Sequence, residues 1–367
     1  DLDLQRLVER SLRRYRSGAA VVLEVNSGRV LASASRPSFD PNVLTGRLSV
    51  DEMQRLLKDP HRPLLDKVFR ENYFPGSTYK VVPAIAAAEL GLVDWEEKII
   101  CKRFYRKYRV PKRCSHAHGA VDLRYALIES CNIFFYTIAE RIGMDPMARY
   151  AQTLGLGAST GLGINGEVGG FVPTKAWYKR RKQRFRIGYT LNAAIGQGNV
   201  KVTPIQLATL YAAIANGGKL YLPQIVERIE RHDGAVVQRF EPRLRRVIDV
   251  KPETISRVQD ALAGVVEDIK GTAYDSRDKQ IAIAGKTGTA QVVGRGKKRG
   301  YWLNDHSWFV AYAPSGAPEI AVAVLIEHGG RAAKVAAPVA VGIVRGYFKY
   351  VRPYASGGER APAAAAP

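Results

Sequence analysis

Long apolar runs are missing from this sequence of 367 residues. No stretch reaches the length of about 18 apolar residues that a helix needs to cross a bilayer, so no segment is expected to span a membrane. No signal peptide is visible, and the chain opens at Asp1 without a methionine. We therefore expect that an upstream part of the protein has been removed. Histidine is also scarce, with six residues, and no Ser/His/Asp triad can be placed from them.

Acidic residues are few as well: 34 Asp and Glu stand against 56 Lys and Arg, which gives a net charge of +22. Basic clusters lie at 13–16, 102–113, 179–186 and 295–299. A basic surface attracts polyanions, such as nucleic acid, an anionic lipid surface or an acidic cell-wall polymer. No zinc finger, RNP sequence or helix-turn-helix signature accompanies the charge, so we expect no nucleic-acid partner. A merely solvated basic face is the alternative.

The hydrophobic content of 46% and the charged content of 25% are those of a soluble globular protein with a sizeable core. Two β-rich runs around Asn26-Ser27-Gly28 predict a hairpin, and strands at the end of the chain should enclose a mostly helical middle. The expected strands are 18–25, 29–35, 280–284, 306–313 and 319–327, and the expected helices are 77–92, 121–143, 203–216, 252–268 and 335–347. Residues 294–300 should form a mobile loop, and 354–367 are low in complexity and predicted to be disordered.

Three short motifs follow one another along the chain: Ser77–Lys80 (Ser-Thr-Tyr-Lys), Ser130–Asn132 (Ser-Cys-Asn) and Lys286–Thr289 (Lys-Thr-Gly-Thr). Each alone is weak evidence. Together, in this order, they are typical of penicillin-binding proteins and serine β-lactamases. We therefore interpret the chain as a serine acyl-transferase.

The first motif suits nucleophilic catalysis because a serine hydroxyl needs a base to take its proton. Lys80 lies one helical turn after Ser77, and burial in an apolar helix would lower its pKa and fit it to act as that base. The opposing interpretation is a capping serine followed by a surface lysine.

The third motif ends an apolar stretch, so we expect it at the lip of a sheet, on an edge strand that can accept an extended peptide. Gly288 would allow close approach of another backbone, Thr287 and Thr289 offer hydroxyls, and Lys286 offers a charge. Ser130 and Asn132 would present a hydroxyl and an amide to the same cleft; taken alone, they would instead indicate an interrupted helix.

Five segments carry a specific resemblance to class B penicillin-binding proteins, and most of all to the elongation-specific penicillin-binding protein 2 type: 74–80, 130–136, 192–198, 203–208 and 284–291. The resemblance covers about residues 1 to 350. It implies an α/β (α+β) fold like that of penicillin-binding proteins and serine β-lactamases: an antiparallel sheet of about five strands flanked by helices, plus a mostly helical subdomain. The transpeptidase domain would then comprise residues 1–352, followed by an Ala/Pro-rich tail at 353–367.

The resemblance also implies roles for single residues. Ser77 would be the acylated nucleophile and Lys80 its base, Ser130 would pass a proton to the leaving D-alanine, and Lys286 would tune Ser130. Asn132, Thr287, Gly288 and Thr289 would bind substrate, and the N–H groups of Ser77 and Thr289 would form the oxyanion hole. Gln197 is expected near the cleft.

The implied substrates are peptidoglycan stem peptides of lipid II-derived strands ending in D-Ala-D-Ala, and β-lactams would act as covalent inhibitors. The resemblance further implies a missing membrane anchor and pedestal, a RodA-type polymerase with other elongation-complex proteins as partners, and an inner-membrane location with the catalytic domain in the periplasm.

Alternatives remain. A β-lactamase or D,D-carboxypeptidase would pass the acyl group to water, but no Glu-x-x-x-Asn stands at the expected place before Lys286. A β-lactam sensor would keep the pocket without turnover. This sequence contains no upstream glycosyltransferase segment, so a bifunctional class A protein is not expected unless the removed upstream part contained one.

All three cysteines fall between residues 101 and 131, and a histidine stands among them. Cys101, Cys114, His118 and Cys131 form a complete tetrahedral zinc set, which predicts a structural Zn²⁺ that ties the 101–118 loop to the Ser130 helix. A Cys101–Cys114 disulfide with a buried, free Cys131 is the competing interpretation. No cofactor is expected for catalysis itself.

Overall fold

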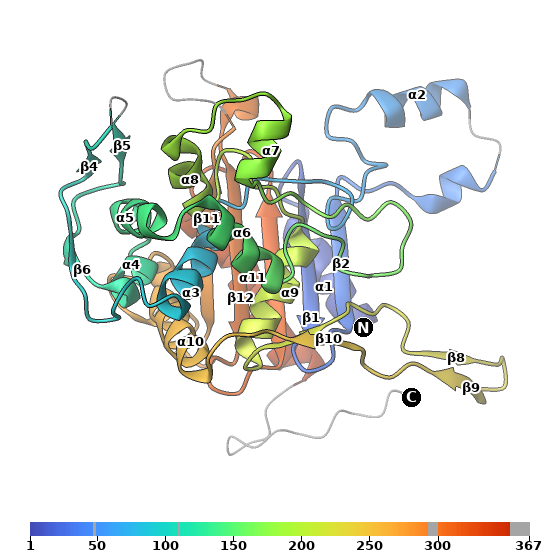
Figure 1. Cartoon of the computed structure of the whole chain (residues 1–367). Coiled ribbons are helices and arrows are strands. Elements are labelled where there is room, and N and C mark those ends of the chain that lie inside the picture. Colours follow the sequence, from blue (N-terminus) through green and yellow to red (C-terminus); the bar gives the residue numbers. More distant parts are fainter. Residues whose placement is uncertain (47–48, 109–110, 293–299, 353–367) are drawn as a thin grey trace.

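A five-stranded antiparallel sheet forms the centre of the protein (Figure 1). The computed structural model describes residues 1–46, 49–108, 111–292 and 300–352. The strand order is β11-β12-β13-β1-β2, so the strand with the Lys-Thr-Gly motif lies at an edge, as predicted. The strands are β1 (Gly18–Glu24), β2 (Val30–Arg36), β11 (Ala284–Ala290), β12 (His306–Ala313) and β13 (Ile320–Ile326).

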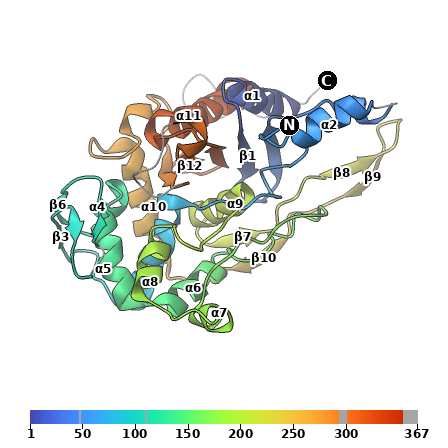
Figure 2. The ribbon, with the colours of Figure 1, turned by 90° about the horizontal axis from the view of Figure 1, so that it is seen from above.

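Helices cover both faces of this sheet (Figure 2). On one face, α1 (Leu2–Leu12) and α11 (Ala336–Gly346) pack on each other and on the strands. On the other face, α9 (Pro204–Ala215) lies across β1, β12 and β13, and α10 (Pro252–Glu267) packs on β11. Thr203 and Gln206 close the N-terminus of α9 as a reciprocal capping box, which confirms the predicted start of that helix.

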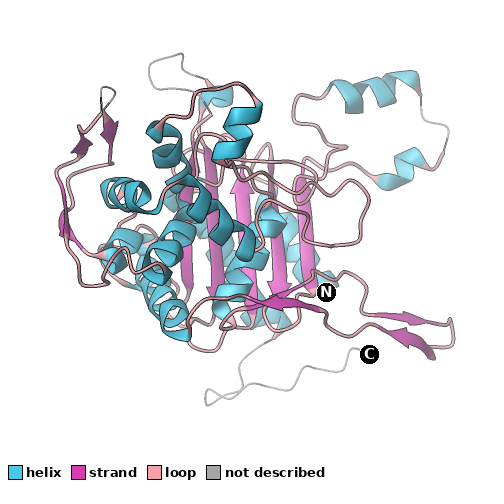
Figure 3. Ribbon diagram, viewed as in Figure 1, coloured by secondary structure: helices cyan, strands magenta, loops and turns pink. Residues whose placement is uncertain are grey.

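A mostly helical subdomain adjoins the β11 edge (Figure 3). Its helices are α3 (Val81–Glu89), α4 (Leu123–Ile128), α5 (Asn132–Ile142), α6 (Met144–Thr153), α7 (Lys175–Arg180) and α8 (Ile187–Ala194). Smaller elements lie around this body: α2 (Val50–Lys58), β3 (Ile99–Cys101), β4 (Phe104–Tyr105), β5 (Lys112–Arg113), β6 (Gly119–Val121), β7 (Lys219–Tyr221), β8 (Arg228–Glu230), β9 (Val236–Arg239) and β10 (Leu244–Val247).

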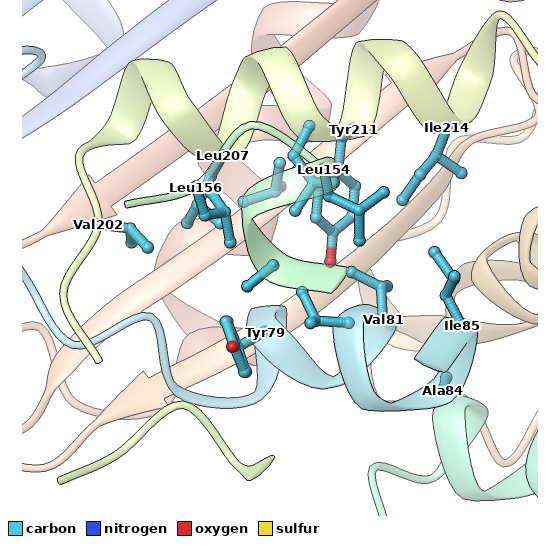
Figure 4. Packing of buried hydrophobic residues seen from close by; sticks show 14 of the residues in the cluster. Tyr79, Val81, Ala84, Ile85, Leu154, Leu156, Val202, Leu207, Tyr211 and Ile214 are labelled. Atoms are coloured by element: carbon cyan, nitrogen blue, oxygen red, sulfur yellow. The ribbon is translucent and has the colours of Figure 1, made fainter. Parts of the chain in front are cut away.

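The core fixes the segment that carries Ser77. Every residue of α9 is buried, and so are Val81 to Ala87 at the start of α3. Figure 4 shows this packing, with α3 and the turn before it facing α9 across Leu154 and Leu156. Because interiors are close-packed, the turn before α3 has little freedom to shift.

Two expectations for the secondary structure were wrong in detail. The helix expected over 121–143 is broken at 129–131 into α4 and α5. The strand expected from 280 begins only at Ala284, and the Lys-Thr-Gly motif lies within it rather than at its end. The loop expected at 294–300 and the tail expected at 354–367 lie almost wholly outside the described residues. Within those residues, no helix has both the length and the apolar character of a bilayer crossing.

Candidate active site

Ser77 lies in a 3-10 turn, Gly76–Lys80, that leads directly into α3. The turn is held from both sides: the Thr78 hydroxyl donates to the Pro75 carbonyl at 2.8 Å, and the Tyr211 hydroxyl of α9 donates to the Thr78 carbonyl at 2.9 Å. The helix predicted to open at Ser77 therefore begins as a 3-10 turn. Ser77 is thus presented on a rigid support at the edge of the sheet.

Lys80 links the first motif to the second. Its side chain is fully buried, and Nζ donates to the Ser130 carbonyl at 2.7 Å, to Asn132 Oδ1 at 2.7 Å and to Ser130 Oγ at 3.1 Å. Burial lowers the pKa of Lys80 to about 8, although the thiols of Cys114 and Cys131 act in the opposite direction. A substantial neutral fraction near physiological pH is what a general base needs.

Ser130 occupies the break between α4 and α5 and has a φ of 57°. This left-handed conformation is unfavourable for a side chain with a Cβ and is usually taken by glycine at a helix end. The break turns Ser130 and Asn132 toward Lys80, where an unbroken helix would have placed them a half-turn apart. The strained residue is therefore also a residue of the predicted site.

The third motif lies in β11 beside the nucleophile turn. Gly288 faces Pro75 so closely that a Cβ built on it would be 2.8 Å from the Pro75 carbonyl oxygen. The Thr287 hydroxyl is 2.8 Å from that of Thr272, and Gln197 donates to the Thr289 carbonyl at 3.1 Å. The predicted place of Gln197 near the cleft is confirmed.

Lys286 is buried completely, and its Nζ has no hydrogen-bond partner among the described residues. Burial lowers the pKa of Lys286 well below its ordinary value, and the nearby Lys80 lowers it further. Two lysines thus lie close together behind the cleft, both shifted toward their neutral forms.

A cavity of about 370 Å³ joins the three motifs. Ser77, Ser130, Asn132, Thr287 and Thr289 line it, as predicted, while Lys80 and Lys286 lie buried behind it. Residues that sequence reasoning did not assign also line it: Ser115, His116, Glu129, Thr272, Arg331, Ala332 and Ala333. No local pattern marks these residues, because they come from four separate segments that only the fold brings together.

Gly196 was also missed as a residue that shapes the site. Its carbonyl accepts a hydrogen bond from the Gly76 N–H at 2.9 Å. Its φ is 66°, and a Cβ built on it would lie only 2.1 Å from the Gly76 carbonyl oxygen. The signal was the Gly-Gln-Gly run at 196–198, which predicts a tight backbone but not what it touches.

Cys101, Cys114, His118 and Cys131 come together beside the Ser130 break. All three cysteines are free thiols, and one ligand atom from each of the four residues lies within 4.8 Å of the others. His118 Nδ1 is 3.4 Å from the sulfur of Cys101 and 3.5 Å from that of Cys114. The Cys114 sulfur also accepts the Asn132 N–H at 3.1 Å. Three thiols and one imidazole are thus close together, a donor set that suits zinc, and the Cys101–Cys114 disulfide is not formed.

Together, the turn, the broken helix and the edge strand bring the three motifs to one cavity, with the lysine of the first motif buried. Residues 18–345 match the family model described as penicillin binding protein transpeptidase domain. The chain belongs to this family of penicillin-binding proteins.

Individual relatives agree with this assignment. Peptidoglycan D,D-transpeptidase MrdA of Haemophilus influenzae is 33% identical over 358 residues, which are 93% of this chain and 54% of that protein. Among solved structures, Pseudomonas aeruginosa PBP2 in complex with WCK 5153 superposes with a TM-score of 0.85 at 33% identity, covering all of this chain and 80% of the other. The Helicobacter pylori complex of PBP2 and MreC gives a TM-score of 0.84 at 28% identity, over 95% of this chain and 63% of that one. The present chain spans about half the length of the curated relative.

Proposed function

We propose that this domain is a peptidoglycan D,D-transpeptidase that acts in cell elongation. The observation that carries the proposal is the contact of one buried lysine, Lys80, with both Ser130 and Asn132. These two residues line one cavity together with Ser77 and the strand β11. The names of the relatives support the same activity.

In the first half-reaction, Ser77 Oγ attacks the carbonyl carbon between the two D-alanines of a stem peptide. Neutral Lys80 takes the hydroxyl proton, and the N–H groups of Ser77 and Thr289 stabilise the oxyanion. The peptide C–N bond then breaks, and Ser130 passes a proton to the departing D-alanine. Thr287 and Thr289 would hold the terminal carboxylate of the stem peptide, and Asn132 its amide.

In the second half-reaction, an amine of a neighbouring strand attacks the ester carbon and displaces Ser77. A β-lactam would acylate Ser77 in the same way, but its ring-opened leaving group stays attached and hinders the second attack. A β-lactamase or D,D-carboxypeptidase would instead deliver water. Such an enzyme needs a carboxylate that activates water, and no Glu-x-x-x-Asn precedes β11 to supply it. Within the described residues, the carboxylate closest in sequence to Ser130 is that of Glu129.

The test is the intact mass of the protein after incubation with a fluorescent penicillin, for the wild type and for Ser77→Ala. A stable adduct on the wild type alone supports the proposal. Rapid loss of the adduct with drug turnover would indicate a β-lactamase, and no adduct on the wild type would refute an acylating serine at residue 77.

We also propose the wider context of the longer relatives. The chain would be held at the inner membrane by a part outside this sequence, with the catalytic domain in the periplasm. A RodA-type polymerase would supply the strands. The complex of Helicobacter pylori PBP2 with MreC supports a protein partner for this domain as well.

A structural zinc ion at Cys101, Cys114, His118 and Cys131 is a further part of the proposal. The four donors belong to the loop at 101–118 and to the N-terminus of α5, so an ion there would join the two segments. The ion would have no chemical step; it would hold Asn132, whose N–H already contacts the Cys114 sulfur.

Metal analysis of untagged protein, together with its melting temperature, tests this. We expect about one zinc per chain, lost together with several degrees of melting temperature in Cys101→Ser. His232→Ala is the matched control, because His232 is exposed and belongs to neither group of candidate metal ligands among the described residues, and it should keep the metal. Protein without zinc, or with a Cys101–Cys114 disulfide in a peptide map, would overturn the zinc proposal.

A further inference from the structure

Glu129 directly precedes the catalytic-site serine of the second motif. It is the last residue of the turn that ends α4, and the left-handed Ser130 follows it. Both residues line the cavity that contains Ser77. The side chain of Glu129 is only 13% exposed, and no described residue donates a hydrogen bond to its carboxylate. Nε2 of the exposed His116 lies 4.0 Å from this carboxylate, and a ring nitrogen of His118 lies within 4.8 Å of it.

The charges around this carboxylate are otherwise positive. Glu129 is the only acidic residue among the described residues that line the cavity. Arg331 lines the same cavity, and Lys80 and Lys286 lie buried behind it. In a chain with a net charge of +22, a shielded carboxylate at this place requires an explanation.

The second half-reaction explains a carboxylate at this place, because its nucleophile, an amine, arrives as a cation. A primary aliphatic amine has a pKa of about 10, so at neutral pH it enters the cleft as an ammonium ion. Arg331 and the remaining basic groups would repel it, whereas a carboxylate would attract it and fix its position. Water, the competing nucleophile, carries no positive charge, so the carboxylate does not attract it in this way.

We propose that Glu129 binds the ammonium group of the acceptor strand beside the acylated Ser77 and so favours transfer to an amine over hydrolysis. This inference rests on the proposed transpeptidase function and names the residue that selects its second substrate. The bound ammonium then loses two protons, one to bulk water and one to Ser77 Oγ through Lys80. Its nitrogen forms the new amide bond while the bond from the acyl carbon to Ser77 Oγ breaks.

The experiment measures how one acyl-enzyme partitions between acceptors. A thioester analogue of the stem peptide acylates Ser77, and the amide and free-acid products are counted. One acceptor is a primary amine that is cationic at neutral pH, and the other is hydroxylamine, which is largely uncharged there. The variants are Glu129→Gln, which removes the charge, and Glu129→Asp, which keeps it. Glu253→Gln, on the exposed face of α10, is the matched control.

We expect Glu129→Gln to lower the amide-to-acid ratio about tenfold for the cationic amine and to leave the ratio for hydroxylamine within about twofold. Glu129→Asp should recover part of the loss, and Glu253→Gln should resemble the wild type. An equal fall for both acceptors would overturn the inference and give Glu129 a structural role, such as orienting the nearby His118. An unchanged ratio for both would also overturn it. Absence of acylation in the wild type would instead refute the proposed function itself.

Discussion

Lys80 and Asn132 are joined by a hydrogen bond of 2.7 Å between Nζ and Oδ1, although 52 residues separate them in the chain. The bond couples the residue proposed as the base to the motif proposed to hold substrate. Whatever charge stands at position 132 therefore acts directly on the proton affinity of Lys80.

The rate of acylation should consequently follow the deprotonation of Lys80. Burial lowers the pKa of Lys80 to about 8, so the neutral form increases as pH rises through that value. We expect the second-order rate constant for penicillin acylation to rise between about pH 6 and 9 and then to level off. Stopped-flow fluorescence with a labelled penicillin measures it. A profile without a basic limb in this range would contradict the role of Lys80 as base.

Asn132→Asp should move the rising part of the pH profile of acylation to higher pH. A carboxylate at 2.7 Å stabilises the ammonium form of Lys80, so its pKa should rise by about one unit or more. At pH 7 acylation should then be about tenfold slower, while the plateau at high pH changes less. Asn199→Asp is the control, because it adds the same charge where the amide donates a hydrogen bond to the Tyr178 hydroxyl and has no hydrogen bond to a lysine among the described residues. An unshifted limb in Asn132→Asp would show that the bond does not control the lysine.

A pair of glycine substitutions separates backbone strain from steric conflict. Gly196 and Gly217 have φ values of 66° and 80°. A Cβ added to Gly196 would lie 2.1 Å from the carbonyl oxygen of Gly76, whereas a Cβ added to Gly217 would meet no described atom within 4 Å. Gly217→Ala should cost about 1 kcal/mol from strain alone. Gly196→Ala should cost more, about 2 to 4 kcal/mol, and should also slow acylation by displacing the turn that carries Ser77. Urea unfolding and penicillin acylation measure both, and equal effects of the two substitutions would contradict the close fit.

Sequence reasoning predicted the sheet edge, the hairpin, the capped α9 and the convergence of the three motifs, because each leaves a local signal. The apolar periodicity of 121–143 also predicted one helix, and here the local signal misled. The break at Ser130 is stabilised by contacts from elsewhere, namely Lys80 on the Ser130 carbonyl and Cys114 on the Asn132 N–H. Such tertiary contacts are not encoded in the propensity of the segment itself.

The remaining residues of the cleft could not be predicted for a related reason. Glu129, Thr272 and Arg331 belong to no motif, and only the packing of α4, the segment after α10 and the segment after β13 brings them to one cavity. The clustering of the cysteines was visible in the sequence, but the approach of His118 Nδ1 to two sulfurs depends on the path of the intervening loop.

Lys286→Met should make the protein more stable while it abolishes acylation. Lys286 is buried without a hydrogen-bond partner among the described residues, and burial lowers its pKa. Below an ordinary lysine pKa of about 10.4, the unfolded chain holds a proton that the folded chain does not readily accept, so the folded state loses stability as pH falls. Methionine fills a similar volume without that cost, so we expect Lys286→Met to raise the free energy of unfolding at pH 7 by about 1 to 3 kcal/mol.

This increase in the free energy of unfolding should become smaller as pH rises toward about 10, because Lys286 then becomes neutral in the unfolded chain as well. Urea unfolding at pH 7 and pH 9.5 measures this difference, with Lys98→Met, an exposed lysine, as the control that should change little at either pH. A Lys286→Met variant that is less stable than the wild type at pH 7 would mean that Lys286 stabilises the fold. A stable but inactive variant would instead show that the chain retains a costly buried lysine because the cleft requires its amine.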